Sequence, residues 1–434
     1  MMDADILIIG AGAAGLMAAC ELANAGKKVI VLEAQDRIGG RIHTIYENGS
    51  SKPVELGAEF VHGNLPVTLG LLHEAGIPYH SASASMWKYD EGKFTTNESF
   101  IEHWDLLIDK LNKLSQDTSI DNFIETEFPG DKYLELRESV RQFVSGYDTA
   151  NPKKASSFAL RNEWQSEDES AQHRIEGGYI KLLNYLASEC EANGGQIKLN
   201  IAIAYIHWER GKVSAIAANG MTYYAEKAII AVPLGILQAE AGENGTISFH
   251  PPIKEYQEAM QQMGFGAVIK ILIEFEEAFW ENEATGKAAE GKSLKNMGYL
   301  FSQEEIPTWW TQFPERSTVF TGWIGGPGAW AKKDTPDAEI LKQALQSIAN
   351  IFKREVNELQ NQIRSWHVVN WTAKPFINGS YAYDTVNTPT ARKVLNTSVN
   401  DTLFFAGEYL YEGPAMGTVE AALTSGKNAA EKIK

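Results

Sequence analysis

Three glycines near the N-terminus follow the apolar run 6–9 at the spacing Gly10-x-Gly12-x-x-Gly15. Between a strand and a helix, the first glycine allows a tight turn, the second admits a pyrophosphate, and the third packs the helix on the strand. Free N–H groups at the start of the helix attract phosphate oxygens. Glu33 follows about 20 residues later, where a carboxylate accepts hydrogen bonds from a ribose diol. The spacing therefore predicts dinucleotide binding.

A lysine interrupts the apolar run from Ala267 to Ile273. Inside a core, Lys270 would cost stability unless its ammonium group found partners. On the exposed face of a strand it would be unremarkable. The run alone leaves both interpretations open: a functional cation or a solvated side chain.

The histidines and cysteines show no metal-ligand spacing. Cys20 and Cys190 lie far apart, with no CxxC motif, so we predict no metal site and favour a reducing compartment. A lone histidine such as His62 is more often a surface or core residue than a functional group. The tyrosines, tryptophans and methionines outside the motifs are interpreted as core residues.

The elements around the glycines form a βαβ pattern. The runs 6–9 and 29–32 predict buried parallel strands, and the stretch between them predicts a helix that ends at Gly26. From Ser81 to Arg174, helical spacing and few glycines predict a mostly helical insertion. Other predicted elements are strands at 228–232, 268–275 and 402–406, a surface loop at 285–295 and a helix at 418–433.

Length and composition exclude several classes. A chain of 434 residues with 44% hydrophobic and 22% charged residues predicts two or three folded domains. The net charge of −17 argues against nucleic acid or an anionic membrane as a partner. No run of about 18 apolar residues predicts a membrane span. We therefore expect a soluble, cytoplasmic protein.

The run Glu33-Ala34-x-Asp36-Arg37-x-Gly39-Gly40-Arg41 resembles the signature of the flavin-containing amine oxidases. Further segments add to this resemblance, which covers nearly the whole chain. They are 55–63, as in the polyamine-oxidase and demethylase branch; 231–237, similar to an interdomain strand; 264–280, similar to the strand with the flavin-proximal lysine; and 405–420, similar to the C-terminal flavin-binding block.

The resemblance implies an α/β fold, in which a Rossmann-like FAD-binding domain carries an inserted α+β substrate-binding domain. The FAD-binding domain would comprise residues 1–79, 175–265 and 374–434. The substrate-binding domain would comprise residues 80–174 and 266–373.

The implied cofactor is FAD. Arg41 could clamp phosphate oxygens, Glu408 could bind the ribityl hydroxyls, and the helix that begins at Thr418 would stabilise negative charge on the reduced flavin. The predicted cofactor-binding residues are Gly10, Gly12, Ala14, Gly15, Glu33, Ala34, Arg37, Gly40, Arg41, Gly57, Ala58, Glu59, Ile203, Gly407, Glu408, Thr418 and Val419.

Four catalytic residues follow from the same resemblance. Lys270 would hold a water beside flavin N5, and His62 would line the substrate cavity. Trp371 and Tyr381 would wall the flavin, and Tyr381 would form one side of an amine-binding cage.

Two positions depart from the monoamine oxidase pattern. Ser380 stands where mammalian monoamine oxidases carry the cysteine that binds flavin, which implies noncovalent FAD. The second wall of the cage falls near Pro414 rather than at an aromatic residue. We therefore do not expect a complete monoamine-oxidase-type cage.

The implied reaction is FAD-dependent oxidation of a polyamine, monoamine or related amine to an imine. Hydride would pass to flavin N5, O2 would be reduced to H2O2, and water would hydrolyse the imine. The partners would be a small amine and O2, and the protein a monomer or homodimer. The alternatives are a desaturase or protoporphyrinogen-type oxidase, a noncatalytic flavoprotein, an NAD dehydrogenase, and an L-amino acid oxidase that needs a cavity arginine such as Arg161, Arg174, Arg316 or Arg364.

Overall fold

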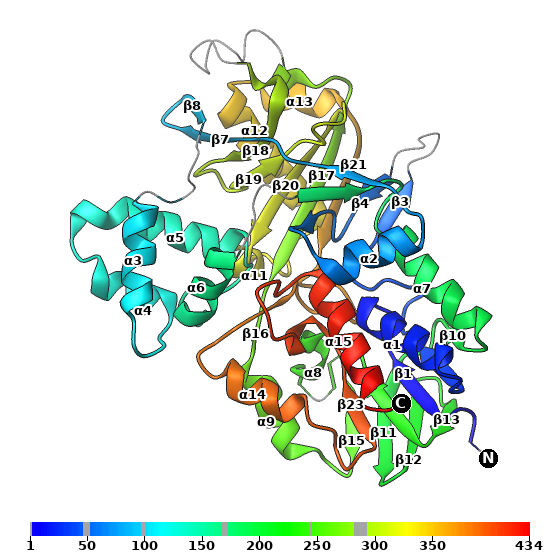
Figure 1. Ribbon diagram of the computed structural model, residues 1–434. Helices are drawn as coiled ribbons and strands as arrows, with labels where there is room; N and C mark the ends of the chain where they lie inside the picture. The colour runs from blue at the N-terminus through cyan, green and yellow to red at the C-terminus, as the bar shows by residue number, and fades with distance from the viewer. Residues whose placement is uncertain are drawn as a thin grey trace.

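The computed structural model describes residues 2–46, 53–96, 101, 103–166, 172–240, 242–243, 245–281 and 293–434. Most of the predicted surface loop at 285–295 lies outside these residues. The described chain builds two large sheets, with a separate group of helices beside them (Figure 1). No helix within the described ranges is long and apolar enough to cross a membrane.

A five-stranded parallel sheet contains the predicted βαβ unit. Its strand order is β10-β2-β1-β14-β23, and every neighbouring pair is parallel. Strands buried on both faces read as continuous apolar runs, as the predicted strands do. The strands are β1 (Ile6–Ile9), β2 (Val29–Leu32), β10 (Gln196–Lys198), β14 (Lys227–Ile230) and β23 (Leu403–Phe405).

Helices cover one face of this sheet and a second sheet covers the other. Ile6 and Ile8 pack with the helices, whereas Leu7 and Ile9 pack with the second sheet. On the helical face, α1 (Ala13–Asn24) contacts both α7 (Ile180–Ala192) and α15 (Val419–Glu431) (Figure 1). The second sheet has the order β13-β12-β11-β15, formed by β11 (Ile203–Glu209), β12 (Lys212–Ala217), β13 (Thr222–Ala225) and β15 (Ser248–His250).

A seven-stranded mixed sheet forms the other large layer, in the order β21-β17-β20-β19-β18-β7-β8. Helix α12 (Asp337–Phe352) packs on one face through a core that includes Ile271 and Ile348. The strands are β7 (Ser85–Asp90), β8 (Lys93–Thr96), β17 (Val268–Phe275), β18 (Met297–Phe301), β19 (Thr308–Trp310), β20 (Val319–Gly325) and β21 (Ile363–Asn370).

The predicted helical insertion from 81 to 174 is only partly right. Its first part is the β7–β8 hairpin, which turns at Glu91 and Gly92, both with positive φ. Strand β7 pairs with β18, about 200 residues later, and local periodicity does not record such a partner. The next part is helical, as α3 (Trp104–Lys113), α4 (Ile120–Glu127), α5 (Leu134–Gly146) and α6 (Ser157–Ser166), and the segment ends in the strand β9 (Gln172–Ile175).

The segment 231–237, expected to be a strand, is also different. Strand β14 ends at Ile230, and α8 (Leu234–Leu237) is one helical turn that begins after Pro233. Proline lacks the N–H group that a strand needs but fits the start of a helix. The chain therefore turns away from the sheet at this point.

Short elements complete the connections. A three-stranded sheet, β5-β9-β6, places His62 opposite Gln172 and therefore brings segment 55–63 beside Arg174. The short elements are β3 (Thr44–Tyr46), β4 (Pro53–Glu55), β5 (Val61–His62), α2 (Pro66–Glu74), β6 (Tyr79–Ser81), β9 (Gln172–Ile175), α9 (Lys254–Gln262), β16 (Gly264–Phe265), α11 (Gly326–Ala331), α13 (Val356–Asn361), β22 (Ala382–Tyr383) and α14 (Thr388–Leu395).

Candidate active site

One cavity of about 1060 Å³ joins the parallel sheet to the mixed sheet and the helices. It is lined by the glycine turn and Glu33, by Lys270, and by residues of α5 and α6 such as Glu163. Of the residues predicted to bind cofactor or to act in catalysis, all line this cavity except Gly15 and Arg37.

The glycine turn leaves open space at the start of α1. Gly12 is the N-cap of α1 and carries no side-chain cap, and a Cβ atom there would meet nothing within 4 Å. By contrast, a Cβ on Gly15 would lie 2.0 Å from the Gly10 carbonyl oxygen. Gly15 thus serves helix–strand packing, while Gly12 leaves free N–H groups beside a cradle that suits an anion.

Glu33 ends the second strand at the cavity, where Ala34 and Ile203 also line the wall. Its carboxylate accepts hydrogen bonds from the backbone N–H groups of Ala11 (2.7 Å) and Gln35 (2.9 Å). Burial raises the pKa of Glu33, and these donors oppose the rise. Together with the open cradle at Gly12, these residues fit the adenosine and pyrophosphate of a dinucleotide.

Arg37 shapes the loop that contains Gly40. Its guanidinium donates to the carbonyl oxygens of Ile38 (3.1 Å), Gly40 (2.7 Å) and Ile42 (3.0 Å). Because Arg37 does not line the cavity, it positions Gly40 there rather than reaching a ligand itself.

Arg41 and Glu408, which were predicted to bind different parts of the cofactor, bind each other. Two guanidinium nitrogens of Arg41 donate to the two carboxylate oxygens of Glu408 at 2.8 and 2.7 Å, and one also donates to the Ser380 carbonyl. Burial raises the pKa of Glu408, but Arg41 outweighs it and holds that pKa below its usual value. The pair joins the loop after β2 to the C-terminal block at the cavity wall.

The start of α15 also lines the cavity. Thr418 is its N-cap and accepts a hydrogen bond from the Ala421 N–H group at 3.2 Å. Val419 and Gly407 lie beside it in the lining. The positive end of the helix dipole is therefore directed at the region where negative charge would be stabilised.

Lys270 is buried, with 1% of its side chain exposed. Its ammonium group donates to the Glu59 carboxylate at 2.8 Å and to the Gly57 carbonyl at 3.1 Å. The solvated interpretation of this lysine is therefore wrong. The lysine lies on β17 between β20 and β21, and the strand turns its side chain into the cavity.

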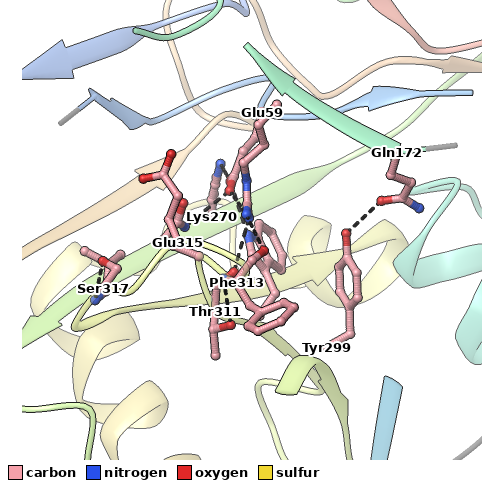
Figure 2. A network of polar contacts seen from close by, with 12 residues as sticks. Glu59, Gln172, Lys270, Tyr299, Thr311, Phe313, Glu315 and Ser317 are labelled. Carbon is pink, nitrogen blue, oxygen red and sulfur yellow. Dashed lines mark hydrogen bonds and ion pairs between the residues drawn. The ribbon is translucent and has the colours of Figure 1, made fainter. Parts of the chain in front are cut away.

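Glu59 is the centre of a buried polar network (Figure 2). One carboxylate oxygen accepts from Arg174 (2.9 Å) and Gln312 (3.2 Å), and the other from Lys270 (2.8 Å) and the Trp310 indole (3.1 Å). Burial alone raises the pKa of Glu59, but the two cations outweigh it and lower the pKa to about 2. Glu59, predicted as a cofactor ligand, thus holds Lys270 in place.

His62 lies among aromatic rings, 5.7 Å from Phe60 and 5.9 Å from Tyr147 between centroids. Its Nδ1 atom is buried without a hydrogen-bond partner among the described residues. Burial lowers the pKa of His62 to about 4, so the imidazole is neutral near pH 7. A neutral ring beside a cavity can exchange hydrogen bonds with an amine without repelling it.

Trp371 and Tyr381 also line the cavity. The Trp371 indole donates to the Leu56 carbonyl at 3.0 Å, and the Tyr381 hydroxyl donates to the Tyr147 carbonyl. Phe60, in the segment 55–63, lines the same cavity. So do several tyrosines and tryptophans that were interpreted as core, namely Tyr147, Trp164, Tyr299, Trp310 and Trp323.

No arginine of the four proposed for a substrate carboxylate lines the cavity within the described chain. Arg174 instead binds Glu59 and the carbonyls of Thr311 and Phe313. Arg41 does line the cavity, but its guanidinium forms an ion pair with Glu408. This arrangement does not favour an L-amino acid oxidase.

The open glycine turn on a parallel sheet and the buried lysine on a mixed sheet define an α/β fold of the nucleotide-binding type. The family model described as flavin containing amine oxidoreductase matches residues 13–434. The chain therefore belongs to the flavin-containing amine oxidoreductase family.

Curated relatives include two kinds of enzyme. The chain is 28% identical over 454 residues to lysine-specific histone demethylase 1 homolog 2 of Oryza sativa subsp. japonica, covering 100% of this chain and 57% of that protein. It is 28% identical over 469 residues to polyamine oxidase 2 of Arabidopsis thaliana, covering 99% of this chain and 88% of that protein. The chain thus spans little more than half the length of the first three demethylases that it matches.

Solved structures show the same fold. Wild-type putrescine oxidase bound to putrescine matches with a TM-score of 0.79 and 20% identity, covering 99% of this chain and 98% of that one. Cyclohexylamine oxidase from Brevibacterium oxydans matches with a TM-score of 0.78 and 19% identity, covering 99% and 98%. These likenesses confirm the predicted α/β fold.

Proposed function

We propose that this protein oxidises a small amine to an imine with noncovalently bound FAD and O2. The observation that carries this proposal is that one continuous cavity joins the Gly12 cradle and Glu33 to the buried Lys270. When bound, FAD would accept a hydride from the amine at N5 and pass the two electrons to O2, and the products would be H2O2 and an imine that water hydrolyses.

The cofactor would lie along the first part of the cavity. Glu33 would accept the ribose hydroxyls, and the N–H groups after Gly12 would hold the pyrophosphate. The Arg41–Glu408 pair would contact the cofactor from one wall, and the N-terminus of α15 would stabilise negative charge on the reduced ring.

The amine would bind among the aromatic rings near His62. An amine needs a free lone pair to support C–H cleavage, and the neutral imidazole of His62 tolerates either amine protonation state. Trp371 and Tyr381 would wall the ring system, and Lys270 would hold a water with the ammonium N–H that Glu59 and Gly57 do not use. Exclusion of bulk water follows from the apolar lining.

Noncovalent attachment has its own test. Ser380 offers no thiol, and its hydroxyl forms a hydrogen bond with Thr149 at 2.6 Å. Acid or heat precipitation of the holoprotein should therefore leave FAD in the supernatant, as measured by flavin absorbance. Flavin that remains on the denatured chain would contradict noncovalent binding.

The division into domains stays a prediction that the sheets support. Every strand of the parallel sheet comes from the proposed FAD-binding segments, 1–79, 175–265 and 374–434. Every strand of the seven-stranded sheet comes from the proposed substrate-binding segments, 80–174 and 266–373.

A cytoplasmic location is supported by the free, buried thiols of both cysteines. A monomer or homodimer stays a prediction.

A peroxide-coupled assay with polyamines, aromatic amines and L-amino acids tests the function. We expect flavin absorbance in the purified protein, anaerobic bleaching by at least one amine, and peroxide in air. A desaturase or protoporphyrinogen-type oxidase would bind flavin but release no peroxide with any amine. A protein whose flavin is reduced by no member of the panel would contradict amine oxidation.

A further inference from the structure

Three charged side chains are joined by hydrogen bonds at Glu59, and their charges do not cancel. Lys270 and Arg174 are cations and Glu59 is an anion, so the three groups carry a net charge of +1. Their side chains are 1%, 11% and 5% exposed, respectively. Among buried side chains, charge is screened less than at the surface and acts over a longer range.

The contacts of Arg174 hold its guanidinium in a fixed position. Its guanidinium donates to Glu59 at 2.9 Å and to the carbonyls of Phe313 (2.9 Å) and Thr311 (3.1 Å), and it lies 4.5 Å above the Phe60 ring. Arg174 does not line the cavity, so it is not itself a ligand. Through Glu59 it is joined to Lys270, which does line the cavity.

Glu59 has a double role in this network. One oxygen fixes the ammonium group of Lys270, and the other fixes the guanidinium of Arg174. The ammonium group uses two of its three N–H bonds on Glu59 and Gly57, and the described chain offers it no third acceptor. The remaining N–H bond is therefore available to the cavity.

We propose that Glu59 and Arg174 are positioning residues that hold Lys270 within a three-charge cluster of net charge +1, and that this charge raises the reduction potential of the bound flavin. The inference rests on the proposed function, because it concerns the cofactor named there. A positive charge stabilises the reduced flavin, which carries negative charge, relative to the neutral oxidised form. Each cation of the cluster should therefore raise the reduction potential of the flavin, and Glu59 should lower it.

The test is a spectroscopic titration of the reduction potential of the flavin-loaded protein. Arg174→Met removes a positive charge and is expected to lower the potential, whereas Glu59→Gln removes a negative charge and is expected to raise it. We expect each shift to be at least the tenfold change in relative affinity that equals about 30 mV for a two-electron couple. Arg174→Lys keeps the charge and should restore a potential near that of the wild type.

A second arginine provides the matched control. Arg137 is also buried, donates to the carbonyls of Phe128 and Gly130, and does not line the cavity. Arg137→Met should destabilise the fold without changing the flavin potential. A merely structural role for Arg174 would give the same result in both methionine variants.

Glu55 also interacts with Lys270 and Glu59, and its pKa is raised by burial to about 7. The titrations are therefore run at pH 5.5 and pH 8.5, so that both of its charge states are sampled. Opposite shifts for Arg174→Met and Glu59→Gln at both pH values support the proposal, and any other pattern overturns it. Flavin that fails to bind, or that no amine reduces, in the wild type would instead count against the proposed function.

Discussion

The two ends of the cavity are built in different ways. The end near Gly12 is shaped by backbone, and its main parts lie within the first 41 residues. The end near Lys270 is shaped by side chains from distant elements, so that Glu59 accepts from a residue 251 positions away. A backbone site should respond mainly to a change of shape or to loss of a ligand contact, whereas a side-chain site should respond mainly to a change of charge.

The largest effect is expected at the backbone end, for Glu33→Ala. The variant loses two charge-assisted hydrogen bonds to the ribose, each worth about 1.5–3 kcal/mol, so the Kd for FAD should rise about 100-fold or more. It also leaves the Ala11 N–H group without its acceptor. Binding of FAD to the apoprotein measures the change, and Glu209→Ala, an exposed carboxylate of β11, is the control. Unchanged FAD affinity would remove Glu33 from the ribose site.

The next effect concerns two glutamates four positions apart, Glu55 and the buried Glu59. The folded-state pKa of Glu59 is lowered from 4.5 to about 2, so its stabilisation is present above pH 4.5 and lost as the pH falls to 2. Burial raises the pKa of Glu55 from 4.5 to about 7, and its hydrogen-bond donors, the Tyr179 N–H and the Thr44 hydroxyl, only partly oppose this rise. Stability from Glu55 is therefore present below pH 4.5 and lost as the pH rises to 7.

Thermal unfolding from pH 3 to pH 8 separates these two contributions. The loss at pH 3 should reach about 2 kcal/mol for Glu59, and that on the neutral side up to about 3 kcal/mol for Glu55. Glu55→Gln should flatten the profile between pH 4.5 and 7 and leave the acid limb unchanged. An unaltered neutral limb in this variant would show that Glu55 does not carry that loss.

The contrast between local and distant partners also explains which features could be predicted from the sequence. The glycine turn, the first two strands and Glu33 are visible because each depends on neighbours close in the chain. The hairpin β7–β8 and the role of Glu59 are not visible, because their partners lie in β18 and in Arg174 and Lys270. The lone lysine in an apolar strand signalled that a buried partner was needed, but nothing local identified it.

The positions of two tryptophans were difficult to predict for the same reason. Trp310 and Trp323 have large apolar side chains of the kind that fill protein cores, and both are largely buried. Only the pairing of β19 with β20 turns them toward the cavity. Their aromatic character was predictable, but their position in the candidate site was not.

A matched pair of glycine variants sharpens the comparison within the backbone end. Gly15→Ala places a Cβ atom 2.0 Å from the Gly10 carbonyl and should lower the stability of the apoprotein by about 1–3 kcal/mol. Gly12→Ala places its methyl group in open space, so the apoprotein should keep its unfolding temperature while FAD binds at least tenfold more weakly. Two measurements distinguish the variants: the unfolding temperature of the apoprotein and the affinity for FAD. Equal stability loss in both would mean that Gly12 also serves packing.

The smallest change is expected at the charged end, for Lys270→Met. Methionine keeps much of the length and packing of the side chain but removes the ammonium donor. Glu59 retains Arg174, Gln312 and Trp310 as donors, so the cavity should persist and FAD should stay bound. If Lys270 holds a water beside flavin N5, reoxidation by O2 should slow by more than the tenfold that about 1.4 kcal/mol of barrier represents.

Stopped-flow measurement of the two half-reactions isolates this role of Lys270. Anaerobic reduction by the amine should change less than reoxidation, because the proposed amine site lies among the aromatic rings near His62, whereas the lysine is proposed to act on the step that involves O2. Parallel measurements on Glu59→Gln show how far the effect depends on placement, since that variant keeps the lysine but loses its carboxylate partner. A wild-type oxidative rate in Lys270→Met would remove the lysine from the reaction and leave it as a structural partner of Glu59.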